Sequence, residues 1–255
     1  MRDHYVGAMR GVALGICPDA TLADITHEIA PQDILGGALE LAAAYKYFPH
    51  GTVFLCVVDP GVGSVRRGLA AEAASYRFVA PDNGVLTMVF KEADPIQVVE
   101  LTNRQYARSS ISRTFEGRDR FAPAAAWLAK GIELCALGTP LTTWKMLDVP
   151  EPRVIGGQLS GIVLRVDRFG NLVTNIDRRR FEAFAAGGVI EIEIAGHPIR
   201  SVVETYVEAE RGSACALFGS SDHLEIAIAG GSAAERLALK RGAPVLVRLK
   251  ADPTK

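Results

Sequence analysis

The first half of the chain alternates short apolar runs with amphipathic segments. Residues 21–29 alternate apolar and polar positions as a strand does, and residues 33–48 repeat apolar residues at helical spacing behind Asp33, a suitable N-cap. Residues 51–59 form an apolar run that ends in a carboxylate, which suits a parallel strand buried on both faces. Strand-like runs at 76–81 and 95–101 flank a helical stretch, so this half reads as βαβ units.

The pattern changes after a proline-containing linker at residues 148–154. Period-two alternation, typical of half-buried antiparallel strands, recurs at residues 161–167, 188–196, 223–229 and 243–250. The sequence therefore predicts two domains: a Rossmann-like α/β domain with a mostly parallel sheet over residues 1–150, and a smaller β-barrel domain over residues 155–255.

Composition narrows the class of protein. The 255 residues are 49% hydrophobic and 22% charged, with a net charge of -1, which is typical of a globular protein and argues against nucleic-acid or polybasic membrane partners. The four cysteines are scattered without a CxxC pair, so no zinc or redox motif is indicated. The first residues lack a signal-like apolar core, which predicts a cytoplasmic protein.

Polar turns fall where parallel strands would end, which is where ligands bind in open α/β sheets. The first, residues 59–67, places Asp59 at a strand end and Arg66 seven residues later, after glycines that allow a tight turn. Such a pair could fix a water or a charged substrate group, or it could simply hold the turn. The second, residues 80–84, contains Asp-Asn-Gly, which is also an ordinary turn signature.

A third polar turn, residues 114–120, carries four charged residues ahead of a helix that Pro123 would begin and Gly131 would end. Loops before helix N-termini are natural ligand sites, although a run of charges is often a solvated loop. In the second domain, Phe169 and Asn171 stand in a predicted turn between strands. An aromatic face beside an amide suits a purine, but a plain hairpin turn also explains these residues.

These segments carry a resemblance to a known family. YVGAMRG, DITHEI, YFPHGTVFLCVVDPGVGSVRR, APDNGVLT, TFEGRDRFAPAAA, DRFGNLVTNI and SSDHLEIAIAGGSAAE occur in the order and rough spacing of the S-adenosylmethionine (SAM) hydroxide adenosyltransferases. These SAM hydrolases are related to the SAM-dependent fluorinase and chlorinase. The resemblance implies an α/β domain, a β-barrel domain and a homotrimer with SAM between subunits. It also implies attack of water on C5′ of SAM to give adenosine and L-methionine, with no cofactor or metal.

The resemblance assigns site residues as well. Asp59 and Arg66 match the aspartate and arginine of the family's water-activating triad, and Glu116 stands where the family has the triad's histidine. The remaining positions match substrate-binding segments, with Asn171 expected on the adenine; they are Asp3 and Tyr5 at the methionine end, Thr114, Phe115 and Gly117 around Glu116, and Asp167, Phe169, Asn171, Ser220 and Ser221 in the second domain.

Two departures from the family shape the hypotheses. Relatives open with an apolar strand and a TDFG-like turn whose aspartate binds the ribose, and this sequence begins just after that point, so its start is either misassigned or truncated, or the strand is absent. The leading hypothesis is a SAM hydrolase in which Glu116 orients or deprotonates the water. Alternatively, Glu116 is a solvated partner of Arg113 or Arg118.

Two other functions compete with hydrolysis. One is a protein that holds SAM or adenosine without turnover. The other is a SAM-dependent halogenase, but a halide buried beside the carboxylate of Glu116 would cost several kcal/mol unless one charge were neutralised, which argues against it.

Overall fold

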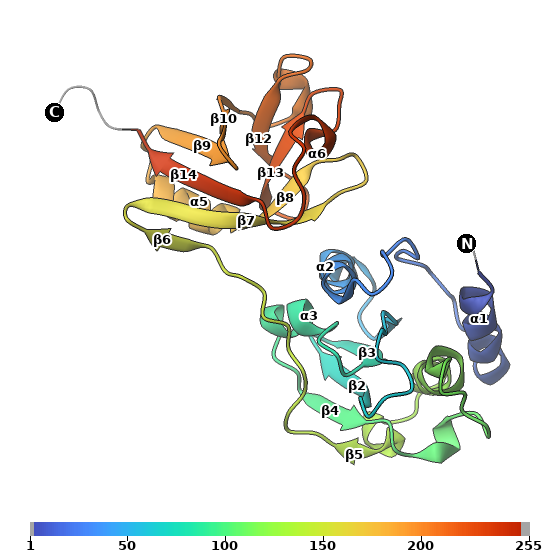
Figure 1. Ribbon diagram of the computed structural model, residues 1–255. Coiled ribbons are helices and arrows are strands. Elements are labelled where there is room, and N and C mark those ends of the chain that lie inside the picture. The colour runs from blue at the N-terminus through green and yellow to red at the C-terminus, as the bar shows by residue number, and fades with distance from the viewer. Residues whose placement is uncertain (1–2, 251–255) are drawn as a thin grey trace. The chain divides into compact units, whose positions relative to one another are not determined.

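The computed structural model describes residues 3–250, and the chain divides into two compact units whose boundary falls between Asp148 and Val149. The first unit is built on a five-stranded sheet of order β1-β3-β2-β4-β5 (Figure 1). Its strands are β1 (Val53–Leu55), β2 (Gly68–Ala73), β3 (Tyr76–Pro81), β4 (Gln97–Glu100) and β5 (Thr139–Pro140).

The directions of these strands differ from the expectation. Strands β1 and β3 run parallel, but the pairings β3–β2, β2–β4 and β4–β5 are antiparallel, so the sheet is mixed rather than mostly parallel and the Rossmann-like description is not confirmed. The cause is a hairpin between β2 and β3 that no turn signature in the sequence marks. Strands β2 and β3 are joined by Ala74 and Ser75, both at positive φ (49° and 66°), without the glycine or asparagine that normally marks such a turn.

Helices cover both faces of this sheet. The helices are α1 (Tyr5–Ile16), α2 (Ile34–Ala44), α3 (Thr87–Glu92) and α4 (Ala122–Ala129). Because successive residues of a strand point to opposite faces, Leu69 of β2 packs with α2 and α3, whereas Ala70 packs with α4. Helix α1 lies against α4 (Figure 1).

Of the elements predicted in this unit, one helix is present and one strand is not. The predicted helix at 33–48 is confirmed as α2, and the side chain of Asp33 accepts a hydrogen bond from the Gly36 amide as its N-cap. The strand predicted at 21–29 is wrong: these residues are irregular and mostly exposed. Their alternation is not supported by a partner strand, which a strand needs for its backbone hydrogen bonds.

The second unit is a nearly closed, barrel-like sheet of order β10-β9-β14-β7-β8-β13-β12-β11, with β6 paired to β7. Its elements are β6 (Arg153–Ile155), β7 (Gln158–Val166), β8 (Leu172–Asp177), α5 (Arg178–Ala185), β9 (Ile190–Ile194), β10 (His197–Ile199), β11 (Ser201–Val202), β12 (Ala214–Phe218), β13 (His223–Ile228), α6 (Ala233–Arg236) and β14 (Pro244–Leu249). The period-two strands predicted from the sequence are thus present, and Ser232 caps α6 by accepting from the Glu235 amide. Among the described residues, no helix is long and apolar enough to cross a bilayer.

Candidate active site

Asp59 lies in a loop beyond the end of β1, and a neighbouring turn fixes that loop. The side-chain amide of Asn83 donates to the carbonyl of Val58 at 2.8 Å, and its oxygen accepts from the Val85 amide at 3.1 Å. The Asp-Asn-Gly turn therefore holds the loop that carries Asp59.

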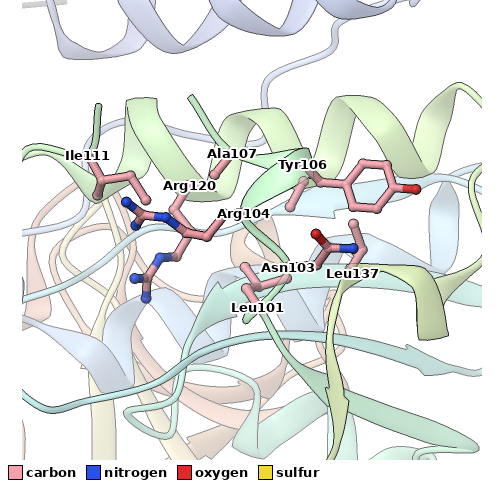
Figure 2. A pocket seen from close by; sticks show the side chains of 9 residues that line it. Leu101, Asn103, Arg104, Tyr106, Ala107, Ile111, Arg120 and Leu137 are labelled. Atoms are coloured by element: carbon pink, nitrogen blue, oxygen red, sulfur yellow. The ribbon is translucent and has the colours of Figure 1, made fainter. Parts of the chain in front are cut away.

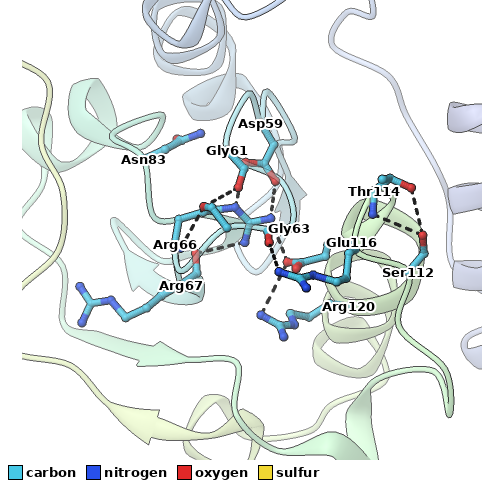
Figure 3. Close-up of polar contacts among 12 residues, drawn as sticks. Asp59, Gly61, Gly63, Arg66, Arg67, Asn83, Ser112, Thr114, Glu116 and Arg120 are labelled. Carbon is cyan, nitrogen blue, oxygen red and sulfur yellow. Dashed lines mark hydrogen bonds and ion pairs between the residues drawn. The ribbon is translucent and has the colours of Figure 1, made fainter.

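Arg66 is fixed through every nitrogen of its guanidinium (Figure 3). Its Nε donates to Oδ1 of Asp59 at 2.8 Å, its Nη2 donates to Oδ2 of the same residue, and its Nη1 donates to the Arg67 carbonyl at 3.4 Å. The ring of Phe121 lies 5.0 Å from the guanidinium carbon. The side chains of Arg66 and Asp59 are only 8% and 5% exposed, so the ion pair is almost fully buried.

Glu116 joins this pair. Its Oε2 accepts from Nη2 of Arg66 at 2.8 Å and lies 3.6 Å from Nη1 of Arg120, and its side chain is 9% exposed (Figure 3). The alternative of a solvated carboxylate paired with Arg113 or Arg118 is therefore wrong. Arg113 instead donates to a backbone carbonyl, and Arg118 bonds a different carboxylate.

A wide helical turn explains how these groups converge. Residues Gly117–Phe121 form a π-helical turn, in which the Ala122 amide donates to the Gly117 carbonyl, and α4 follows with its proline in the first turn. Such turns are rare inside helices and are frequent at functional sites. The turn brings Glu116 and Phe121 against Arg66, and Arg120 to the carboxylate of Glu116.

The other charges of this segment anchor it. Asp119 is fully buried and accepts from the Ser112 amide at 2.9 Å, from Arg118 at 2.7 and 2.8 Å, and pairs with Arg108 at 3.2 Å. The hydrogen bond from Arg118 is the main cause that holds the pKa of Asp119 below its ordinary value, against the effect of burial. Asp119 thus has a structural role.

The methionine-end candidates lie on or beside α1. The ring of Tyr5 meets the ring of Phe115 edge-on at 4.8 Å, and the guanidinium of Arg118 stacks on Phe115 at 4.9 Å. Asp3 is exposed just ahead of the helix. The structure therefore brings Tyr5 to the loop of Glu116.

Two further loop candidates have clear local roles. The hydroxyl of Thr114 lies 3.1 Å from that of Ser112 at the exposed edge of the loop. A Cβ on Gly117 would lie 3.1 Å from Sδ of Met9, so glycine at this position lets α1 approach the loop closely.

In the second unit, residues 167–171 form a tight turn between β7 and β8. Oδ1 of Asp167 accepts from the amides of Phe169 and Asn171, both at 2.8 Å, and Oδ2 accepts from the side-chain amide of Asn171 at 2.9 Å. A Cβ on Gly170 would lie 2.1 Å from Oγ of Ser232, so the turn is seated directly on the start of α6. Phe169 is 79% exposed, whereas Asn171 is buried.

The turn between β12 and β13 carries the other two candidates. Ser220 is exposed, and the carbonyl of Ser221 is 2.8 Å from Nδ1 of His223. Within residues 3–250, Oγ of Ser221 is a buried side-chain atom without a hydrogen-bond partner.

Glu225 lies between these two turns and was not singled out from the sequence. It accepts from the hydroxyl of Tyr206 at 3.1 Å, and a Cβ on Gly219 would lie 1.9 Å from its Oε1. Burial is the main cause that raises the pKa of Glu225, and the nearby charge of Asp167 raises it further. A single carboxylate in the buried apolar run of β13 was the signal that could have identified it.

A small pocket lies behind Arg120 (Figure 2). It is lined by Leu101, Asn103, Arg104, Tyr106, Ala107, Ile111, Arg120, Ala124 and Leu137. Among the described residues, no cluster of three or more His, Cys, Asp and Glu side chains is placed to hold a metal ion.

Comparison with known proteins places this fold and these loops in one family. Residues 1–138 match the model of the SAM hydroxide adenosyltransferase N-terminal domain, and residues 161–246 match that of the C-terminal domain. The chain belongs to the SAM hydroxide adenosyltransferase family, as the motifs indicated.

Individual proteins are similar to this chain over most of its length. The chain is 36% identical to an (R)-S-adenosyl-L-methionine hydrolase of Thermus thermophilus, over 96% of this chain and 94% of that protein. It is 32% identical to a fluorinase of Actinoplanes sp., over 72% of this chain and 71% of that protein. Among solved structures, an uncharacterized conserved protein from Thermotoga maritima matches with a TM-score of 0.92 and 34% identity, covering 97% of this chain and 96% of that one.

Proposed function

We propose that this protein hydrolyses S-adenosyl-L-methionine at C5′ of its ribose and releases adenosine and L-methionine. The observation that carries the proposal is the buried cluster in which Arg66 bonds both Asp59 and Glu116 at a loop beyond the end of β1. Full-length relatives named as hydrolases of (R)-S-adenosyl-L-methionine, at 34% to 36% identity, support this choice of reaction.

The cluster supplies what the displacement needs. The oxygen of water forms a bond to C5′ while the C5′–S bond breaks, and its electron pair leaves on sulfur as the neutral thioether of methionine. The water loses a proton to a carboxylate. Because both Arg66 and Arg120 contact Oε2 of Glu116, Oε1 is the atom through which Glu116 accepts the hydrogen bond of the attacking water.

The protein mainly has to position and desolvate the nucleophile, because a sulfonium is already a good leaving group. Arg66 serves as a template: its hydrogen bonds hold the carboxylates of Asp59 and Glu116 at fixed angles around the water. No cofactor or metal ion has a part in this mechanism.

Most of the groups that hold the substrate come from the second unit. Asn171 uses its amide nitrogen on Asp167, so it offers its oxygen to a donor such as the exocyclic amine of adenine. The exposed ring of Phe169 offers a stacking face for the base. The partnerless hydroxyl of Ser221 suits the polar end of methionine, together with Ser220 and, from the first unit, Asp3 and Tyr5.

We further infer a cytoplasmic homotrimer in which the first unit of one subunit and the second unit of its neighbour complete each site. The division of candidate residues between the two units supports this inference, because neither unit alone holds both the water cluster and the purine turn. Light scattering should give a trimer mass at micromolar concentration. A monomer that retains full activity would contradict it.

The deciding experiment incubates the purified protein with SAM and follows adenosine and methionine by chromatography, while calorimetry measures SAM binding. Adenosine formation in step with SAM loss supports hydrolysis. Binding without adenosine release indicates a SAM-holding protein and overturns the proposal.

A halogenase is the second candidate, because the chain is also similar to fluorinases. The buried carboxylate of Glu116 opposes it, since a halide beside it would bury two negative charges together. Repeating the assay in chloride and in fluoride tests this directly. A halogenated deoxyadenosine in place of adenosine would establish the alternative.

A further inference from the structure

The buried cluster holds more negative charge than Arg66 can balance. Asp59 and Glu116 are both carboxylates with side chains less than a tenth exposed, and both bond the single guanidinium of Arg66. Asp59 already takes two of its hydrogen bonds. An unbalanced charge in a site this dry is costly, so a second cation is needed.

Arg120 is placed to supply that cation. Its Nη1 lies 3.6 Å from Oε2 of Glu116, the same oxygen that Arg66 binds, and it reaches that atom from four residues further along the π-helical turn. Its side chain is 25% exposed and lines the pocket of Figure 2. Its guanidinium group faces the carboxylate of Glu116 (Figure 3).

We propose that Arg120 is a positioning residue for the hydrolysis, a role that rests on the proposed function. It balances the charge of Glu116 and fixes Oε2 between two guanidinium groups, so that Oε1 is turned toward the water. Asp59, Arg66, Glu116 and Arg120 then form one unit with no net charge.

A double-mutant cycle on residues 116 and 120 tests this role. Arg120→Met keeps the apolar stem and removes the charge; we expect kcat to fall at least about tenfold while KM for SAM changes less than threefold. Arg120→Lys keeps the charge and should recover most of the loss. In the Glu116→Gln background, Arg120→Met should change kcat less than twofold, because no carboxylate remains for Arg120 to hold.

Arg104→Met is the matched control, because Arg104 lines the same pocket but is exposed and is not paired with Glu116. It should leave kcat unchanged. If Arg120→Met lowers kcat equally in both backgrounds, or if Arg104→Met has the same effect, the positioning role is overturned.

The four proteins of the cycle are the wild type, Glu116→Gln, Arg120→Met and the double variant. Their unfolding in urea is also measured, which requires no substrate. We expect the two substitutions to be coupled by at least about twofold in the unfolding equilibrium constant. Additive effects would show that Arg120 does not hold Glu116, whatever the activity. A wild-type protein that binds SAM and releases no adenosine would instead overturn the proposed function, while the unfolding cycle would still decide the contact.

Discussion

Nη2 of Arg66 lies 2.8 Å from Oε2 of Glu116, although the two residues stand 50 positions apart in the chain. The contact joins the loop beyond β1 to the π-helical turn ahead of α4. It makes Glu116, which stands where the resemblance predicts a histidine, part of the same buried ion-pair network as Asp59. Substitutions at these residues should therefore act on chemistry and on stability together.

Glu116→Gln should reduce adenosine formation by about 10² to 10⁴-fold, the loss typical of a missing general base. Glutamine keeps the shape and can still accept from Arg66, so SAM binding should persist. The rate is measured by chromatography, with Glu133→Gln as the control, since Glu133 is an exposed carboxylate of the same unit.

Glu116→His introduces the residue that the resemblance predicts at this position. It should preserve or raise the activity, because Asp59 and Arg66 are already in place beside it. Its turnover is compared with that of Glu116→Gln. If neither histidine nor glutamine changes the rate, Glu116 has no part in the reaction.

Removal of Arg66 should damage the fold as well as the activity. Its place on a turn alone would predict a tolerated change, but its burial reverses that expectation. Arg66→Met leaves the two buried carboxylates of Asp59 and Glu116 with Arg120 as their one counter-charge in the cluster. We expect a loss of about 3–5 kcal/mol in the free energy of unfolding in urea. Arg66→Lys keeps the charge without the planar fork and should lose less stability.

For Asp59, an amide replacement separates the two effects. Asp59→Asn keeps the size of the side chain but only one of the two hydrogen bonds that Asp59 accepts from Arg66, because an amide has a single acceptor oxygen. Glu116 still pairs with Arg66, so activity should fall more than stability. Near-normal turnover in Asp59→Asn would remove this residue from the proposed mechanism.

The sequence predicted which residues of the candidate site lie together better than it predicted the sheet. The Asp59 and Arg66 spacing and the charged segment at 114–120 identified residues that the fold brings together in one buried ion-pair network. The motifs do not predict contacts, such as that of Arg120 with Glu116, that depend on the packing of the folded chain. Arg120 could have been suspected from its spacing of four from Glu116, as a helical neighbour, but its contact depends on the π-helical turn.

The strand directions were mispredicted because the turn between β2 and β3 lacks the residues that normally mark a hairpin. Ala74 and Ser75 adopt positive φ without glycine or asparagine, and residues 68–73, rich in alanine, carry little strand propensity. Burial on both faces, which only the tertiary structure supplies, makes them a central strand.

A glycine in the Asp59 loop gives a test of how rigid that loop must be. Gly63 has φ +75°, and a Cβ there would lie 2.2 Å from the carbonyl oxygen of Arg113. Gly157 also has φ +75°, but a Cβ would meet nothing within 4 Å. Gly157→Ala should therefore cost only the strain of a left-handed residue, about 1–2 kcal/mol, and leave activity unchanged.

Gly63→Ala should cost more than Gly157→Ala in urea unfolding, because the loop must also move away from Arg113. The movement should displace Asp59 and Arg66, which flank Gly63, and lower adenosine formation. Equal costs for the two variants would mean that the loop yields without strain.

The last prediction concerns the pH dependence that Glu225 imposes on stability. Its pKa is raised from an ordinary value of 4.5, first by burial and then by the charge of Asp167, while the hydrogen bond from Tyr206 opposes the shift. A raised pKa means that the folded protein keeps this proton at a pH where the unfolded chain has lost it. Protonated Glu225 therefore makes its full contribution to the free energy of unfolding below about pH 4.5. This contribution is lost as the pH rises through the raised pKa.

Glu225→Gln removes the ionisation and keeps an oxygen that can accept from Tyr206. Its midpoint of thermal unfolding should match that of the wild type near pH 4 and exceed it at pH 7 to 8. Glu191→Gln, the same change at an exposed position of β9, should show no such pH-dependent gain. A gain at pH 4 that disappears at neutral pH would mean that ionised Glu225 stabilises the fold, the opposite of what its burial implies.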